Sequence, residues 1–463
     1  MTLDALVPLL RCPACGGALA LDRVLQPDPE AGDCGVLRCP CSADYPVLDG
    51  VPVLRTGTLD RRSIADDLVL APGPSVAAVV SRVEAGEALG ALVDLLSAPL
   101  CPWPLHKVAA LRRLSLREPL RSVGLALRRR RVRAMLCRRD SLTAEDWLAS
   151  FYWHAPEVYD PFNYFFFRFG TPRHLATLGL ASVLPDATSP VLDLACGYGH
   201  LAHTLTAPGR AVVGLDQNVH QAWLARHYVA PEAAFVCADA SRPLPFTDGA
   251  FASAVCSDAF HYVRDKRGAV AELDRTTNGG PLLFPTVGNA LVGEPDGHEL
   301  APDAYRALFD GWHVRVTSDD AVFHRYRDGV GPDLADADAD AEADGARWLA
   351  LVATRHDPAP LLRDHGPLDG WPHAAGRLTL NPLYEPEGDR YALRLPSPWY
   401  EAENGGLRDY MPPAVGRGAE PTPDLVARAA FVGLPERYAR RRRPRVVAAN
   451  RALSALLGRG RGT

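Results

Sequence analysis

Residues 191–200 read VLDLACGYGH, a stretch in which an acidic side chain comes directly before a glycine-rich turn. Gly197, Gly199 and Ala202 fit the G-x-G-x-x-A form of the dinucleotide-binding fingerprint, and Asp216 follows at about the spacing of the ribose-binding acid. Glycine has no Cβ, so a ligand can approach the backbone of such a turn closely. The stretch therefore predicts a nucleoside-containing ligand held where a strand ends.

Three acids near the ends of apolar runs indicate which ligand fits this turn. Asp193 would repel a pyrophosphate, whereas S-adenosylmethionine has no phosphate and carries a cationic amino group and a sulfonium. Asp216 could accept hydrogen bonds from the ribose hydroxyls of either cofactor, and Asp239 could accept one from an adenine amino group. The acids favour S-adenosylmethionine and leave an NAD enzyme as the weakest alternative. They could also be helix N-caps in an inert sheet.

Residues 160–356 resemble the class I S-adenosylmethionine-dependent methyltransferases. The family pattern matches, in order, in VLDLACGYG, VVGLD, CADASRPLPF, CSDAFHYV and the NGG that follows. The resemblance implies that Asp193 and the glycines hold the methionine part, Asp216 the ribose, and Asp239 with Ala240 the adenine. The full set of expected cofactor-binding residues is Tyr164, Arg168, Asp193, Ala195, Gly197, Gly199, Asp216, Gln217, Asp239, Ala240 and Ser257.

Two residues after the fourth strand are candidates for handling the proton of a methyl acceptor. His261 in AFHYV would lie beside the transferred methyl, where an imidazole can act as a general base or position the acceptor. Asp258 is the second candidate. His261 could equally be a packed core residue, and the resemblance does not decide this because acceptor chemistry varies within the fold.

An aromatic stretch, FYWHAPEVYDPFNYFFFRFGTP at residues 151–172, precedes the first strand, where members of the family often close a lid over the cofactor. Such a stripe is more often core than cofactor contact. Tyr164 and Arg168 nevertheless have polar ends that could reach the methionine carboxylate.

The cysteines of the first tenth of the chain have the spacing of metal ligands. Cys12 and Cys15 form a C-x-x-C pair, whereas Cys39 and Cys41 are one residue closer, so that Cys34 could replace either of them. We expect four sulfur ligands around a structural zinc, with no open position for catalysis. Residues 8–54 also resemble the small zinc ribbons that pair with tRNA and protein methyltransferases. A ribbon that has lost its metal is the alternative.

The apolar runs predict an α/β fold with a Rossmann-like sheet and helices on both faces. Strand-length runs lie at 191–195, 211–216, 233–239, 252–258 and 281–287. WHVRVT (312–317) and RWLALVATR (347–355) fit the antiparallel pair that ends the sheet in this family, with the acidic stretch DLADADADAEAD inserted between them.

The changes in pattern along the chain divide it into four parts. We expect a zinc-ribbon module over 1–56, a helical linker over 57–150, the methyltransferase domain over 151–356 and a C-terminal accessory domain over 357–463. Residues 376–400 of the last part suggest a short β-unit, and VVAANRALSALL suggests a final helix.

Composition describes a soluble globular protein. The 463 residues are 47% hydrophobic and 23% charged, with a formal net charge of −5. LVLAPGPSVAAVV is broken by Pro72 and Pro74, so no apolar run reaches the ~18 residues that span a bilayer. The N-terminus lacks the features of a signal peptide, which favours a cytoplasmic protein.

Two arginine-rich runs, 128–139 and 437–445, could grip nucleic acid phosphates, although the first has no interleaved aromatic residues and the chain is mildly acidic. A solvated helix face explains them better. The sequence thus favours methyl transfer to O, N or C of a small molecule, such as a specialised metabolite. An RNA methyltransferase and a non-catalytic cofactor-binding scaffold are the alternatives, and the oligomeric state is not predicted.

Overall fold

The computed structural model describes residues 1–62, 69–98, 117–152, 161–185, 189–207, 209–293, 297–335 and 343–439. The predicted final helix at 446–457, most of the second arginine-rich run and most of the inserted acidic stretch lie outside these residues. Among the helices of the described part, none combines the length and the apolar character needed to span a bilayer.

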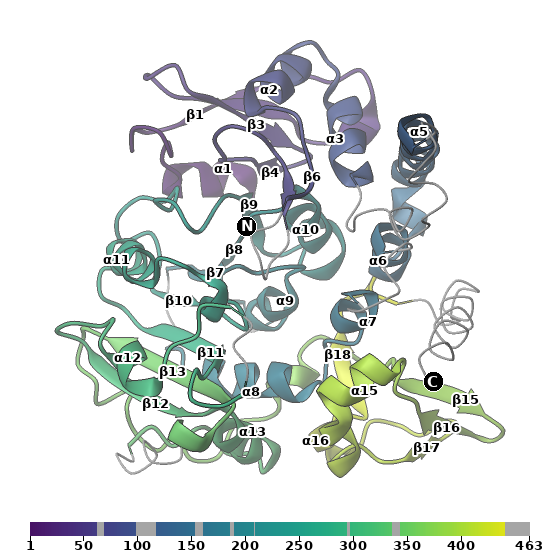
Figure 1. The fold of residues 1–463 in the computed structure, drawn as a ribbon. Helices are drawn as coiled ribbons and strands as arrows, with labels where there is room; N and C mark the ends of the chain where they lie inside the picture. The colour runs from purple at the N-terminus through teal and green to yellow at the C-terminus, as the bar shows by residue number, and fades with distance from the viewer. Residues whose placement is uncertain are drawn as a thin grey trace.

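A seven-stranded mixed sheet forms the centre of the molecule (Figure 1). Its strands are β7 (Val191–Leu194), β8 (Val212–Asp216), β9 (Ala234–Cys237), β10 (Ser253–Val255), β11 (Leu282–Gly288), β12 (His313–Ser318) and β13 (Trp348–Thr354). They lie in the order β12-β13-β11-β10-β7-β8-β9. The pairs from β11 through β10, β7 and β8 to β9 are parallel, whereas β13 is antiparallel to both β11 and β12. The predicted fold class and its antiparallel final pair are confirmed.

Helices cover this sheet on both sides. They are α8 (Pro172–Ala181), α9 (His200–Thr206), α10 (Val219–Leu224), α11 (Lys266–Thr277), α12 (Pro302–Arg306) and α13 (Asp319–Arg327). Figure 1 shows the strands between α11 on one side and α9 and α10 on the other. β7, β8 and β9 are buried at every position, as their unbroken apolar runs require when both faces are covered.

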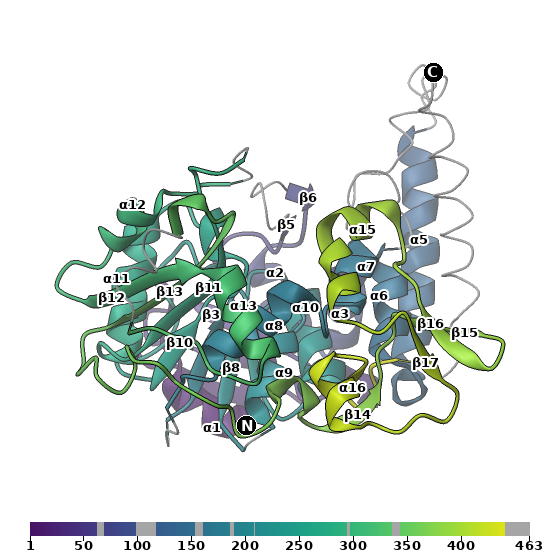
Figure 2. The same cartoon turned by 90° about the horizontal axis from the view of Figure 1, so that it is seen from below.

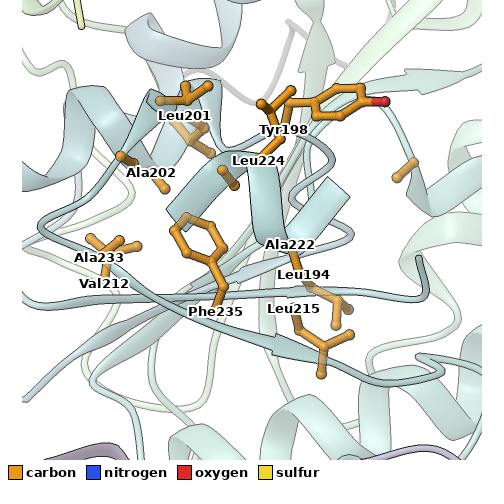
Figure 3. Packing of buried hydrophobic residues seen from close by; sticks show 14 of the residues in the cluster. Leu194, Tyr198, Leu201, Ala202, Val212, Leu215, Ala222, Leu224, Ala233 and Phe235 are labelled. Atoms are coloured by element: carbon orange, nitrogen blue, oxygen red, sulfur yellow. The ribbon is translucent and has the colours of Figure 1, made fainter. Parts of the chain in front are cut away.

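The core under α9 and α10 is closely packed around Phe235 of β9, whereas Leu194 of β7 and Leu215 of β8 point to the other face of the sheet (Figure 3). A Cβ on Gly199 would lie 2.9 Å from the Cβ of Ala225 and 3.1 Å from the ring of Phe235. Gly199 also has a φ of 77°, a backbone angle that residues other than glycine rarely adopt. This glycine is therefore needed for packing between helix and strand.

The cysteine-rich module is a four-stranded antiparallel sheet that continues the large one. Its strands are β1 (Ala20–Arg23), β2 (Gly35–Arg38), β3 (Asp44–Leu48) and β4 (Val51–Pro52), after the short helix α1 (Leu3–Leu6). Just beyond β4, Val53 forms a parallel β-bridge with Cys237 at the end of β9. Figure 1 shows the module, in purple, beside β9 and α10. The module therefore covers one edge of the large sheet.

The segment that follows the module contains the expected helices α2 (Val76–Glu84), α3 (Ala88–Ser97), α5 (Arg117–Leu136) and α6 (Ala144–Tyr152). It begins, however, with a strand pair that the sequence pattern does not reveal, β5 (Arg61–Arg62) and β6 (Val69–Ala71). Strand β5 is held by residues that are distant in sequence. Arg61 Nη2 donates to the Leu95 carbonyl at 3.1 Å, and the Arg62 N–H donates to Asn218 Oδ1 at 3.1 Å.

The C-terminal region, residues 357–439, folds as two small sheets with two short helices. Its elements are β14 (Arg377–Leu380), β15 (Tyr384–Glu387), β16 (Arg390–Leu393), α15 (Pro398–Asn404), β17 (Ala414–Gly416), α16 (Pro423–Ala427) and β18 (Phe431–Leu434). The predicted β-unit is divided, because β14 pairs with β18 while β15, β16 and β17 form the second sheet. Figures 1 and 2 both show α15 beside α7 (Pro161–Phe166).

Candidate functional site

The order of the strands reverses at β7. The chain runs from β7 outward through β8 to β9, and then from β10 outward to β11 on the other side. In open α/β sheets the crevice at the carboxyl ends of such strands binds the ligand. Asp193 and Ala195 lie at the end of β7, Asp216 ends β8, Asp239 follows β9, and Ser257 and Asp258 follow β10. The predicted site residues are thus brought to one edge of the sheet.

The turn after β7 is less crowded at Gly197 than at Gly199. A Cβ built on Gly197 would find Gln221 Nε2 at 3.8 Å and the Phe165 ring at 3.9 Å as its nearest neighbours, which is ordinary contact. Gly197 has a φ of 53° and Ala195 one of 57°. A residue other than glycine, such as Ala195, uncommonly adopts a left-handed backbone conformation, and such conformations cluster at ligand sites. A ligand could therefore approach the turn more closely at Gly197, whereas Gly199 serves packing.

Asp193 is a buried acid with an unused oxygen. Its residue is 2% exposed, and no donor within the described residues lies in hydrogen-bond distance of its Oδ2. Burial raises the pKa of Asp193 to about 8, and the charge of Asp216 acts in the same direction. A cation close to this carboxyl would favour the ionised form and so be bound by it.

Asp216 is fastened to the glycine turn by its own carboxylate. Its Oδ2 accepts a hydrogen bond from the Gly197 N–H at 3.1 Å, and its Oδ1 accepts one from the Asn218 N–H at 2.9 Å. Burial raises the pKa of Asp216 to about 7, and the two backbone hydrogen bonds act against that rise. Each carboxylate oxygen keeps a further lone pair, which suits acceptance from hydroxyl groups.

The loops after β8 and β9 hold the remaining residues expected on the nucleoside side. Asp239 Oδ1 accepts from the Ser241 N–H at 3.0 Å and from Ser241 Oγ at 2.6 Å, so this acid organises its own turn. Ala240 next to it is partly buried. The main-chain oxygen of Gln217 accepts a hydrogen bond of 2.8 Å from Nη1 of Arg55, which links this loop to the cysteine-rich module.

Tyr164, Arg168 and Asp258 form one hydrogen-bonded group at the end of β10. Tyr164 Oη donates to Asp258 Oδ2 at 2.6 Å, and Arg168 Nη1 donates to the same oxygen at 2.8 Å and to Tyr164 Oη at 2.7 Å. Burial acts to raise the pKa of Asp258, but Arg168, Arg173, His261 and Tyr164 outweigh it and hold the pKa below its usual value. Asp258 is therefore an ionised carboxylate that already accepts two strong hydrogen bonds.

His261 lies in a single helical turn, Phe260–Tyr262, and is 1% exposed. The centroid of its ring is 4.1 Å from that of Tyr262 and 5.6 Å from that of Trp348. Its Nδ1 has no hydrogen-bond partner among the described residues. Burial lowers the pKa of His261, although Asp258 acts in the opposite direction. The ring is thus a neutral imidazole at neutral pH and can accept a proton.

The contacts of the predicted Ser257, and the residues Arg173, Thr286 and Asp319 near it, carry no recognisable sequence signal. Ser257 Oγ is 2.8 Å from Thr177 Oγ1 of α8, and the Arg173 guanidinium carbon lies 4.3 Å from the centroid of the Trp348 ring. Thr286 has a φ of 56°, which is a clear outlier for a β-branched residue. Asp319 holds it by accepting from the Thr286 N–H at 3.1 Å and from Oγ1 at 3.0 Å. Backbone strain of this kind cannot be inferred from the residue type.

The four cysteines predicted as metal ligands lie together, with all their Sγ atoms within 4.8 Å of one another. The Sγ atoms of Cys12 and Cys41 are 3.8 Å apart, and those of Cys15 and Cys39 are 3.4 Å apart. Thiolates around a tetrahedral zinc, with bonds of about 2.3 Å, are separated by about 3.8 Å. Cys34 donates instead to the Ala31 carbonyl at 3.2 Å. The donor set therefore fits a zinc ion held by sulfur alone.

Several arginines of the first basic run have partners within the chain. Arg129 forms an ion pair of 2.7 Å with Asp94, and Arg133 one of 3.5 Å with Asp28. Arg128 donates to the Phe151 carbonyl at 3.3 Å, and burial lowers its pKa to about 10. These contacts hold the long helix α5 to the rest of the fold.

Comparisons with known proteins give a family for the sheet. Residues 192–284 match the family described as "Methyltransferase domain". The YcgJ protein of Bacillus subtilis is 19% identical, with a TM-score of 0.29, over 40% of this chain and 99% of its own. A TehB-like SAM-dependent methyltransferase of Corynebacterium glutamicum is also 19% identical, with a TM-score of 0.29, over 39% of this chain and 86% of its own.

A geranyl diphosphate methyltransferase in complex with GPP and sinefungin is 17% identical, with a TM-score of 0.30, over 39% of this chain and 76% of its own. No curated protein matches the chain. The matched residues run from β7 into β11 and include the glycine turn and the ends of β8, β9 and β10. Residues 192–284 therefore carry the similarity to a methyltransferase domain, at the predicted glycine turn and strand ends.

Proposed function

We propose that this protein transfers a methyl group from S-adenosylmethionine to an oxygen, nitrogen or carbon of a small-molecule acceptor at the carboxyl ends of β7 and β10. The observation that supports this most directly is the unpartnered Oδ2 of buried Asp193 just before the glycine turn. A cationic ligand satisfies this oxygen, whereas the pyrophosphate of NAD would be repelled by it.

Different residues at this edge of the sheet bind different parts of the cofactor. Asp193 and the backbone at Gly197 and Gly199 hold the methionine part, Asp216 binds the ribose hydroxyls, and Asp239 with Ala240 binds the adenine. When bound, S-adenosylmethionine supplies an electrophilic methyl on its sulfonium. Ala195, Gln217 and Ser257 complete the wall of the site. Tyr164 and Arg168, which Asp258 orients, bind the methionine carboxylate from the other side.

His261 is the residue that we assign to the acceptor's proton. Its buried, neutral imidazole can take that proton as the new bond forms. Asp258 is already an ionised acceptor of two hydrogen bonds, so its contribution to the reaction is to orient Tyr164 and Arg168. Most of the acceleration then comes from alignment of the acceptor with the methyl.

The cysteine-rich module binds zinc in a structural role. The set Cys12, Cys15, Cys39 and Cys41 offers four sulfur ligands and leaves no position for a reacting water. A four-stranded sheet of this size cannot bury enough apolar surface by itself, so metal binding contributes directly to its folding free energy.

A small acceptor is favoured over RNA because the arginines of α5 are engaged. Arg128 and Arg129 already have partners within the chain, the Phe151 carbonyl and Asp94, with which phosphates would have to compete. An RNA methyltransferase would show salt-sensitive RNA binding that neutralising Arg128 to Arg131 removes. A non-catalytic scaffold would bind the cofactor yet release no S-adenosylhomocysteine with any member of an acceptor panel.

The test is calorimetric titration of the purified chain with S-adenosylhomocysteine and, separately, with NADH. We expect micromolar binding of S-adenosylhomocysteine, weakened at least tenfold by Asp216→Ala and by Asp239→Ala, because each removes an acceptor for a buried ligand donor. Asp310→Ala, at an exposed position away from this edge, is the matched control. Binding of NADH alone would overturn the proposed cofactor.

A further inference from the structure

We infer that the C-terminal region positions the aromatic segment, residues 161–170, and thereby holds Tyr164 and Arg168 at the cofactor site. Tyr400, Tyr410 and Tyr438 are the positioning residues. The link to the cofactor rests on the proposed function. The physical basis is a set of hydrogen bonds between two parts of the chain that are distant in sequence.

Three tyrosine hydroxyls of the C-terminal region point at main-chain oxygens of the aromatic segment. Tyr410 Oη donates to the Gly170 carbonyl at 2.6 Å, and Tyr400 Oη donates to the Phe167 carbonyl at 3.3 Å. Tyr438 Oη is 3.1 Å from the Phe165 carbonyl and 3.0 Å from that of Phe166. The side-chain amide of Asn381 reaches the Phe169 carbonyl at 3.5 Å.

Most of these carbonyls take their donors from outside the segment, although that of Phe165 also accepts from the Arg168 N–H at 3.3 Å. α7 ends at Phe166, and the last carbonyls of a helix have no intrahelical donor. Phe166, Phe167 and Phe169 are buried, so water is kept away from the main chain beside them. A buried carbonyl without a donor is costly. The tyrosine hydroxyls, which are themselves buried, therefore stabilise this particular path of the chain.

The aromatic rings add packing at the same places. The rings of Phe166 and Tyr438 are stacked, with centroids 5.6 Å apart and planes 3° from parallel. Phe167 meets Tyr400 edge-on at 5.8 Å, and Phe169 meets Tyr438 edge-on at 5.0 Å. Figures 1 and 2 show α15, which carries Tyr400, lying along α7. The segment is thus held by both its main chain and its rings.

The other side of the same segment faces the cofactor site. The Phe165 ring is the neighbour 3.9 Å from the position of a Cβ on Gly197, and it meets the ring of Tyr198 at 4.7 Å. Tyr164 and Arg168 both donate to Asp258 at the end of β10. Residues 164–168 therefore connect the site to the C-terminal region over a short stretch of chain. If the aromatic segment became mobile, Tyr164 and Arg168 would move away from Asp258.

A charged contact runs beside these hydrogen bonds. Arg173 of α8 pairs with Glu403 of α15 at 3.0 Å, while its guanidinium lies over Trp348 next to His261. The C-terminal region thus contacts α8 as well as the aromatic segment. The C-terminal region therefore influences cofactor binding without having to contact the ligand itself.

The experiment compares the full chain with its Tyr400→Phe/Tyr410→Phe variant by amide hydrogen exchange and by calorimetry with S-adenosylhomocysteine. We expect exchange at the Phe167, Arg168 and Thr171 amides to rise about tenfold and affinity to fall about fivefold or more, because the binding-competent state becomes less populated. Saturating S-adenosylhomocysteine should restore slow exchange in the variant, since it binds only the held segment.

Tyr384→Phe is the matched control. It removes one buried hydroxyl, which donates to the Pro412 carbonyl at 2.8 Å inside the C-terminal region. We expect it to lower stability without changing exchange of the aromatic segment or affinity. Equal behaviour of the control and the double variant would overturn the inference, and Tyr400→Phe alone replaces the double variant if that chain does not fold. Absence of S-adenosylhomocysteine binding by the unmodified chain would overturn the proposed function, while exchange would still decide whether the segment is held.

Discussion

Val53 forms a parallel β-bridge with Cys237, and the next N–H, that of Leu54, donates to the Cys237 carbonyl at 2.8 Å. The cysteine-rich module therefore extends the sheet of the methyltransferase domain at β9. One residue further, Arg55 Nη1 donates to the Gln217 carbonyl directly after Asp216. The folding of the module and the shape of the loop on the ribose side of the site are thus connected through a few hydrogen bonds.

Zinc removal should loosen this connection. We expect about one zinc per chain in the unmodified protein, and Cys39→Ser should lose the metal and melt several degrees lower, because metal binding contributes to the folding free energy of the module. Metal analysis and a thermal melt measure both effects. The exposed Cys137 is the control, and its serine variant should keep the zinc. A Cys39→Ser chain with full zinc content would contradict the ligand assignment.

Asp49 is the second anchor of the module. Its Oδ2 accepts from Trp223 Nε1 at 2.9 Å and pairs with Arg139 at 2.8 Å, and its residue is 4% exposed. Asp49→Ala leaves Arg139 without this partner and should lower the free energy of unfolding by about 3 kcal/mol, as measured by urea denaturation. Asp22→Ala, which breaks an exposed pair with Arg38, should cost less than about 1 kcal/mol. Equal losses in the two variants would contradict this account.

The sequence predicts the sheet well, because its strands are buried on both faces and so appear as unbroken apolar runs. The positions of Asp193 and Asp216 follow from those runs, since each acid stands at or beside a strand end. The contacts of Tyr400 and Tyr438 cannot be predicted in this way, because their partners at 165–167 are more than two hundred residues away. Division of the chain into four parts, and the roles of the individual site residues, stay predictions.

His261→Gln should separate the chemical step from cofactor binding. Loss of a general base typically costs about a hundredfold or more in kcat, while affinity for S-adenosylhomocysteine should stay unchanged. Burial lowers the pKa of His261, so the unprotonated base persists through neutral pH, and kcat should decline only as the pH falls below about 6.5. The acid limb should vanish in the variant. His356→Gln, at an exposed histidine, is the control and should leave kcat unchanged.

Binding of the cofactor should release a proton from Asp193. The carboxyl has a pKa of about 8 in the free protein, so it is mostly protonated at pH 7, whereas a cationic ligand binds its ionised form. Affinity for S-adenosylhomocysteine should therefore rise by up to about tenfold per pH unit between pH 5.5 and 7.5, with close to one proton released at pH 7. Calorimetry in two buffers of different ionisation enthalpy measures that proton. Asp193→Asn should bind more weakly and release about one proton fewer, the remainder coming from Asp216 with its pKa of about 7, whereas Asp310→Asn should behave as the unmodified chain. Identical heats in the two buffers would mean that Asp193 is already ionised before the ligand arrives, and that its free oxygen is satisfied in another way.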